Sequence, residues 1–238
     1  MTSCANAFEE FLSCVVPAGS RDAARRRLQH RAKLSSLTRN ASFEVSEGDH
    51  QIIYVACGVT KLVAHMSDSR DQVLAFQFVG DIFTVPAPDN YVYSVIALRE
   101  ARLVTFPSDD YLTEATTEPG ILRHLLDNTI LSLRRSREKV IALGSKTAAE
   151  RLAVFLLNMA ERIGTERDGL CAFDLPMSRR DISESLGLTI ESVSRQLTKL
   201  RDDGVIETIG RSKVILRRPE LLRERAGYST RSCAISSS

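Results

Sequence analysis

Long apolar runs are missing from this sequence of 238 residues. None approaches the roughly eighteen residues that a membrane-spanning helix needs. The N-terminus also lacks the apolar stretch behind a basic start that marks a secretory signal. We therefore expect a cytoplasmic protein with no membrane among its partners. Hydrophobic residues make up 43% of the chain and charged residues 26%, which is typical of a folded protein with one large domain or two modest ones.

Close groups of metal-binding or catalytic residues are missing as well. No two of the five cysteines form C-x-x-C, and the four histidines are scattered, so we expect no metal site. The sequence also has no Ser/His/Asp set or phosphate loop, so we expect no catalytic residues and no enzyme. The odd number of cysteines favours reduced thiols. Cys57 fits a small buried side chain better than a redox sensor, but redox activity of Cys57 or Cys171 stays open.

The first half of the chain changes texture at residue 35. Residues 1–34 favour a polar helical segment, and its basic run 25–27 fits a solvated helix face better than a nucleic-acid contact. Residues 35–116 predict a roll or sandwich of hairpins, because short β-type runs alternate with turns. Gly48, Gly58 and Gly80 fall at turns that need a positive φ or a close backbone approach. The runs are 42–45, 52–56, 60–66, 73–78, 91–97 and 102–106.

A heptad seam marks residues 117–145 as one long helix. A seam of this length needs a partner helix. Packing against the roll of the same chain would satisfy it too, but basic side chains on the other face favour a homodimer. The seam positions, spaced four and three residues apart, are Leu122, Leu126, Thr129, Leu133, Ser136, Val140 and Leu143.

Residues 146–226 carry the pattern of a winged helix-turn-helix, and we expect the tail at 227–238 to be disordered. After a helix over 146–163, a short helix begins at Ser178, with Asp181 three residues on. Gly187 fits the left-handed turn between helices. Thr189 caps a second helix over 189–200, which has the shape to enter a major groove. Its inner face consists of Val193, Leu197 and Leu200.

The outer face of the second helix is polar. Arg195 suits the two acceptors of guanine, and Glu191 can accept from the amino group of cytosine. These two side chains stand four residues apart, so they can also pair with each other. An ordinary surface helix would have the same ion pair. Two alternating strands at 205–208 and 214–217 favour DNA binding instead, because they form a wing whose tip carries Arg211 and Lys213, suited to phosphates.

These residues resemble the CRP/FNR family of bacterial transcription regulators, and within it the FixK-like branch. The resemblance covers about residues 37–222 and is strongest at LPMSRRDISESLGLTIESVSRQLTKL, residues 175–200. YVACGVTKL (54–62) and FQFVGDIF (76–83) also fit. The resemblance implies an α+β fold with an N-terminal cyclic-nucleotide-binding-like β-roll, a long dimerisation helix and a C-terminal winged helix-turn-helix. It also implies a homodimer on double-stranded DNA that works with RNA polymerase, most often as an activator.

The E-x-x-S-R pattern of the second helix implies specific base contacts within that family. Glu191 and Arg195 are expected at a G·C pair and Ser194 at a neighbouring thymine of a TTGAT-N4-ATCAA-like palindrome. The resemblance also implies control of genes for oxygen-limited respiration, denitrification or nitrogen fixation, without saying which genes. Backbone or flanking contacts are expected from Ser178, Arg179, Arg180, Thr189, Ser192, Lys199, Arg211 and Lys213.

The signals that such proteins sense find little support in the residues. An iron–sulfur cluster lacks its closely spaced cysteines. Cyclic AMP lacks its arginine, because Gly80-Asp81 is followed in residues 86–93 by no cation for the phosphate. Haem is not excluded by His50 and His65, although a lone histidine is usually a packed residue. We therefore expect a regulator without a cofactor. The alternative is a sensor gated by haem or a cyclic nucleotide, whose C-terminal helices could instead bind protein.

Overall fold

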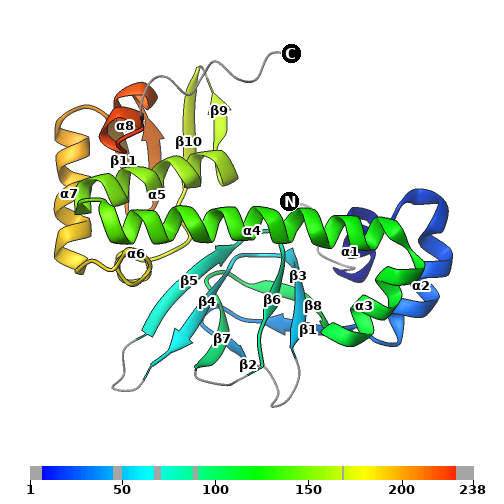
Figure 1. The fold of residues 1–238 in the computed structure, drawn as a ribbon. Coiled ribbons are helices and arrows are strands. Elements are labelled where there is room, and N and C mark those ends of the chain that lie inside the picture. The colour runs from blue at the N-terminus through cyan, green and yellow to red at the C-terminus, as the bar shows by residue number, and fades with distance from the viewer. Residues whose placement is uncertain (1–6, 45–49, 67–70, 88–90, 168, 229–238) are drawn as a thin grey trace. The chain divides into compact units, whose positions relative to one another are not determined.

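The computed structural model describes residues 7–44, 50–66, 71–87, 91–167 and 169–228. The chain divides into two compact units, Met1–Ser136 and Arg137–Ser238. The division falls inside the longest described helix, α4 (Pro119–Ser145) (Figure 1). No helix in these described ranges is both long and apolar enough to cross a membrane.

The first unit contains a roll of two antiparallel four-stranded sheets (Figure 1). Side chains from both sheets, such as Ile53, Leu103 and Val95, are fully buried between them and form one core. The first sheet is ordered β1 (Lys33–Leu37), β8 (Ala101–Pro107), β3 (Gln51–Cys57) and β6 (Ile82–Val85). The second is ordered β2 (Ser42–Glu44), β7 (Val92–Ala97), β4 (Thr60–His65) and β5 (Asp71–Gln77).

The six strands predicted from the sequence are present, with ends displaced by a residue or two, while β1 and β6 were missed. Strand β1 is polar and largely exposed, so it lacks the apolar alternation that marks a strand. Gly58 and Gly80 have the predicted positive φ, 84° and 90°; a Cβ on Gly58 would lie 2.1 Å from the carbonyl oxygen of Glu100. Gly48 and part of the predicted run 42–45 lie outside the described residues.

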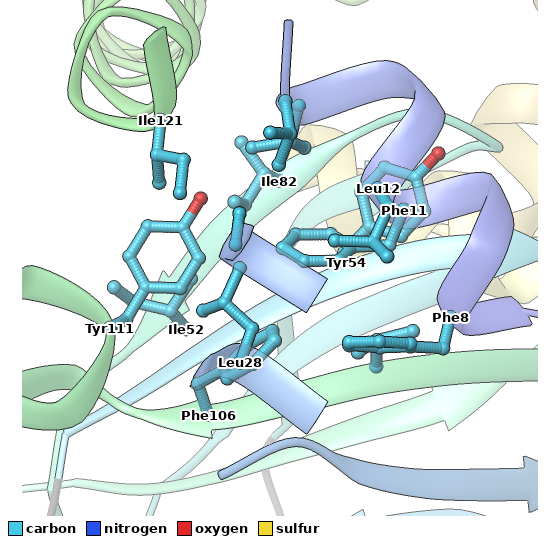
Figure 2. Packing of buried hydrophobic residues seen from close by; sticks show 14 of the residues in the cluster. Phe8, Phe11, Leu12, Leu28, Ile52, Tyr54, Ile82, Phe106, Tyr111 and Ile121 are labelled. Carbon is cyan, nitrogen blue, oxygen red and sulfur yellow. The ribbon is translucent and has the colours of Figure 1, made fainter. Parts of the chain in front are cut away.

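The N-terminal segment is less polar in its packing than the sequence suggested. Phe8, Phe11 and Leu12 are buried against the first sheet, and Phe11 makes an edge contact with Tyr54, with ring centroids 5.4 Å apart. Figure 2 shows these rings meeting Phe106 over the sheet. The segment therefore forms part of the core of the first unit. Its helices are α1 (Ala7–Val15), η1 (Ala18–Ser20) and α2 (Arg21–Gln29), joined there by α3 (Ser108–Thr117).

The basic run on α2 is used within the chain. Arg25 pairs with Glu9 on α1. Arg27 Nε lies 2.7 Å from Oε2 of Glu114 on α3, whose residue is only 6% exposed. A buried carboxylate needs such a partner, because an unpaired charge in the interior is costly. Intramolecular ion pairing, rather than a nucleic-acid contact, therefore accounts for Arg25 and Arg27, while Arg26 is exposed.

The second unit combines four helices with a small antiparallel sheet that continues into the wing. The sheet order is β11-β12-β10-β9. Two short antiparallel strands, β9 (Thr165–Arg167) and β10 (Leu170–Asp174), were not revealed by the sequence. The remaining elements are α5 (Ala148–Ile163), α6 (Arg179–Leu186), α7 (Ile190–Asp202), β11 (Ile206–Ile209), β12 (Lys213–Leu216) and α8 (Pro219–Arg225).

Candidate nucleic-acid interface

Both helices of the helix-turn-helix begin where the sequence predicted. The Ser178 Oγ accepts from the backbone N–H of Asp181 at 3.2 Å, and the Asp181 carboxylate accepts from the backbone N–H of Ser178 at 2.7 Å. Helix α6 then ends at Gly187, which has φ 61° in the left-handed region. The Thr189 Oγ1 accepts from the N–H of Ser192 at 3.1 Å and caps α7. Local hydrogen bonds thus fix the turn and the start of the recognition helix.

Burial decides which face of α7 points outward. Val193, Leu197 and Leu200 are at most 5% exposed, and the helix packs against α5 and α6 through them. On a helix, residues that lie two positions from these three point the opposite way. The inner face predicted from the spacing is therefore present, and the E-x-x-S-R side is left on the surface.

The exposed face of α7 carries Glu191, Ser194, Arg195 and Lys199, as predicted. Neither Glu191 nor Arg195 forms an ion pair with any residue in the described part of the chain. The expected pairing between them is therefore absent, and both heads are available to a partner. Thr198 shares this face, four residues after Ser194, and was missed. The four-residue spacing from Ser194 could have revealed that Thr198 lies on this face.

The flanking residues divide into capping groups and exposed cations. The hydroxyl of Ser178 donates to Asp181, and that of Thr189 donates to Ser192 at 3.0 Å, so these four polar side chains serve the helix ends. Arg180 pairs with Glu184 at 2.8 Å, with its side chain 75% exposed. Burial lowers the pKa of the half-buried Arg179. These contacts leave Arg180 as the most accessible cation at the start of α6.

The wing rises from the sheet beside the helix-turn-helix. Strands β11 and β12 pair antiparallel, and Gly210 at their turn has φ 64°. Both Arg211 and Lys213 are exposed at the tip, as predicted. The backbone N–H of Leu175 donates to the carbonyl oxygen of Ser212 at 2.9 Å and fastens the tip to the segment before α6. The wing thus presents two cations on an anchored hairpin.

The heptad seam on α4 lies on the surface. Leu122, Leu126, Leu133 and Val140 are 46–69% exposed. Thr129 and Ser136 are exposed too, and Leu143 is half-buried. The roll of the same chain therefore does not cover most of the seam. The neighbouring apolar side chains Ile130 and Ile141, which the sequence analysis left out, are 56% and 59% exposed.

Polar side chains of the roll are engaged with one another. Nδ1 of His65 lies 2.8 Å from the Asp71 carboxylate, and its Nε2 lies 2.9 Å from Ser94 Oγ. The Asp81 carboxylate accepts from the backbone N–H of Phe78 at 2.8 Å and lies 3.9 Å from Arg135 on α4. Of the three roll residues singled out as possible ligand contacts, His65 and Asp81 therefore bind other parts of the first unit, and Nδ1 of His50 accepts from the backbone N–H of Ala87 at 3.0 Å.

The cysteines differ from one another. Cys14 and Cys171 are free thiols. Cys57, half-buried at the end of β3, is disulfide-bonded, so the expectation of reduced thiols is wrong at this position. Burial raises the pKa of Cys171, which lowers its thiolate fraction and its reactivity. Within the described residues, no three histidine, cysteine or carboxylate side chains are grouped to hold a metal ion.

Comparison with known proteins identifies relatives over most of the chain. Residues 150–225 match the Crp-like helix-turn-helix domain. The chain is 38% identical over 181 residues to the nitrogen fixation regulation protein FixK of Azorhizobium caulinodans, with 74% of this chain and 73% of that protein covered. It is 33% identical over 177 residues to the transcriptional activator protein FnrL of Cereibacter sphaeroides, covering 73% and 71%.

Solved structures support the same fold. FixK2 from Bradyrhizobium japonicum superposes with a TM-score of 0.72 and 28% identity, covering 84% of this chain and 99% of its own. A CooA mutant from Carboxydothermus hydrogenoformans also reaches 0.72, at 18% identity. The predicted fold, a cyclic-nucleotide-binding-like roll with a C-terminal winged helix-turn-helix, is confirmed.

Proposed function

This chain belongs to the FixK-like branch of the CRP/FNR family of DNA-binding transcription regulators, and from that premise we propose that it binds a TTGAT-N4-ATCAA-like palindrome as a homodimer. Its relatives are regulators and not enzymes. The DNA site, the oligomeric state and the signal each depend on particular side chains.

The exposed face of α7 carries the proposal for sequence reading. Glu191 and Arg195 lack ion pairs among the described residues, and Ser194 lies between them on the same surface. A forked guanidinium fits the two acceptors of guanine, and a carboxylate accepts from the paired cytosine. Glu191 and Arg195 therefore read one G·C pair, and Ser194 contacts the neighbouring thymine. Phosphate contacts come from Arg180, Lys199 and the wing.

The exposed seam of α4 supports a homodimer. Four of its apolar side chains are 46–69% exposed, and the neighbouring Ile130 and Ile141 are 56% and 59% exposed. A monomer rarely leaves so much contiguous apolar surface in water. A second copy of the same helix would cover the seam symmetrically and present two reading helices related by a twofold axis. A palindromic site has the same symmetry.

The polar contacts in the roll support a regulator that works without a bound ligand. Both ring nitrogens of His65 already have partners, so haem ligation would have to break one of them. Asp81 caps the turn at Phe78 instead of presenting its carboxylate to a ribose. Control then comes from how much protein is made. The competing candidate, a haem- or nucleotide-gated sensor of the same family, needs those contacts to open.

The relatives' names support a proposal for the cellular setting of this protein. Two of them are a nitrogen fixation regulator and a transcriptional activator. By analogy, this protein activates genes of oxygen-limited respiration, denitrification or nitrogen fixation together with RNA polymerase, in the cytoplasm.

One experiment separates these possibilities. The purified protein, with nothing added, is examined by absorption spectroscopy and titrated with a TTGAT-N4-ATCAA duplex and with a duplex whose G·C pairs are exchanged for A·T. We expect a colourless protein that binds the first duplex at least about tenfold more tightly, a difference of roughly 1.4 kcal/mol. Equal affinity for both duplexes would overturn the base assignment. A haem spectrum, or binding only after a nucleotide is added, would favour the gated sensor.

A further inference from the structure

One arginine of the second unit hydrogen-bonds to backbone carbonyl groups at the ends of two helices. Arg151 lies in the first turn of α5 and is half-buried. Its Nε donates to the carbonyl oxygen of Lys146 at 2.9 Å, and its Nη2 donates to that of Leu143 at 2.7 Å. Its Nη1 donates to the carbonyl oxygen of Leu186 at 3.1 Å. The Leu143 oxygen belongs to the last turn of α4 and the Lys146 oxygen to the residue that follows this helix, while the Leu186 oxygen belongs to the end of α6.

The chemistry of helix ends explains why this arrangement is stable. The last four carbonyl groups of a helix lack partners within the helix, and the helix dipole favours a positive charge there. A guanidinium offers five donors in a rigid planar fork, so a single side chain can satisfy several carbonyls in fixed directions. Lysine would bring a charge without that geometry. Arg151 therefore fixes an angle between helices as well as neutralising their ends.

Two further contacts place the same junction against the turn of the helix-turn-helix. Nζ of Lys139 on α4 donates to Oγ of Ser185 on α6 at 3.2 Å, and Ser185 is only 6% exposed. A Cβ added to Gly187 would lie 3.4 Å from Cδ2 of Leu143 and 3.6 Å from Nη1 of Arg151. The end of α4, the guanidinium and the turn before α7 therefore lie in direct contact.

We infer that Arg151 is a positioning residue that sets the direction of the recognition helix α7 relative to the last turns of α4, which carry the seam residues Val140 and Leu143. The inference rests on the proposed function, because only a dimer on a palindrome gives this direction a consequence. Val140 and Leu143 of the seam lie within the last turns of α4, and α7 begins four residues after Leu186. A change in the junction therefore shifts the separation of the two reading helices, although no base contact is touched.

The test compares half-site spacing in variants of the full-length protein. Arg151→Met removes the donors, Arg151→Lys keeps only the charge, and Arg162→Met removes an arginine from the last turn of the same helix as a control. Each protein is titrated with palindromes of the four-base spacer, with spacers one base pair shorter and longer, and with a single half-site. We expect wild type and the control to prefer one spacer, while both Arg151 variants lose about tenfold or more of that preference and retain their half-site affinity.

A merely structural arginine would give a different result. In that case palindrome and half-site affinities would fall together while the spacer preference persisted, and the inference would be overturned. An unchanged preference in both Arg151 variants would overturn it as well.

Hydrogen exchange on the DNA-free protein tests the same junction independently of the proposed function. We expect Arg151→Met to speed exchange at the backbone N–H groups of Lys146 and Leu188 together, whereas those of Val193 and Leu197 in α7 stay protected. Unchanged exchange at Lys146 and Leu188 would overturn the inference. Failure of wild type to bind any palindrome would overturn the proposed function instead, whatever the exchange shows.

Discussion

The helix-turn-helix and the β-roll are both well packed, yet they differ in what their polar side chains are left to do. On α7, Glu191 and Arg195 point to solvent without ion pairs among the described residues. In the roll, His65 binds both Asp71 and Ser94. A surface that keeps charged side chains unpaired is suited to a partner, whereas one that pairs them internally is stabilised without one. The exposed face of α7 is therefore suited to recognise a partner, whereas the roll serves as a scaffold.

The largest expected effect comes from disrupting the exposed seam of α4. Leu133→Glu places a charge in the exposed seam of α4 and should leave a monomer, with palindrome affinity lower by about 100-fold or more because the second half-site is no longer linked. Leu131→Glu is the matched control, since Leu131 is similarly exposed, 45% against 48%, and lies on the other side of the helix. Sedimentation and DNA titration measure both. A dimeric Leu133→Glu protein would contradict the seam assignment.

Within the helix-turn-helix, one serine is expected to affect the stability of the fold and another is expected to affect the recognition of DNA bases. Ser178→Ala removes the cap of α6 and should lower the free energy of unfolding by about 1 kcal/mol. Ser194→Ala, on the exposed face of α7, should leave stability unchanged and weaken binding to sites with the expected thymine. Urea denaturation and DNA titration of both variants check this division. If Ser194→Ala were the destabilising one, the roles would be reversed.

Substitutions in the wing should lower the affinity for DNA without changing the sequence preference. Arg211→Ala and Lys213→Ala each remove one proposed phosphate contact per subunit, which lowers the slope of log affinity against log salt by about 0.9 per contact and so by about 1.8 for the dimer. Binding to all sequences weakens alike. Titrations at several salt concentrations on specific and scrambled duplexes provide the slopes. A selective loss on the specific duplex would instead assign these side chains to base reading.

A smaller effect follows from the buried amine at the junction. Burial lowers the pKa of Lys139 from 10.5 to about 8. Between these values the unfolded chain holds a proton that the folded chain has released, so the contribution of Lys139 to stability rises with pH above about 8. Lys139→Met should flatten that rise, whereas the exposed Lys199→Met should not. Urea midpoints at pH 7 to 10 compare the three proteins, and an equal rise in all of them would contradict the burial of this amine.

Much of the reading surface could be predicted from sequence because its signals are local. The caps at Ser178 and Thr189, the turn at Gly187 and the inner face of α7 depend on residues three or four apart, where helix geometry is decisive. The positions of the heptad seam could be predicted in the same way, because they too are three or four residues apart. Strand β1 and helix α3 were missed, because tertiary packing rather than periodicity defines them.

The junction at Arg151 could not have been predicted in the same way. Its partners are backbone carbonyls five, eight and thirty-five residues distant, and a carbonyl leaves no mark in the sequence. The bond between His65 and Ser94, twenty-nine residues apart across neighbouring strands, also required the register of the sheet. The sequence therefore predicts a partner-facing surface better than it predicts the contacts that hold it in place.

The central claim is that Arg195 reads a guanine, and its most direct test is a double-mutant cycle between this side chain and one base pair. Affinities of wild type and Arg195→Ala are measured on the palindrome and on a duplex in which the assigned G·C pair becomes A·T. If Arg195 reads that guanine, wild type should lose about 1–3 kcal/mol on the altered duplex while Arg195→Ala loses little, because the contact is already gone. Equal losses by the two proteins would show that Arg195 does not read the base.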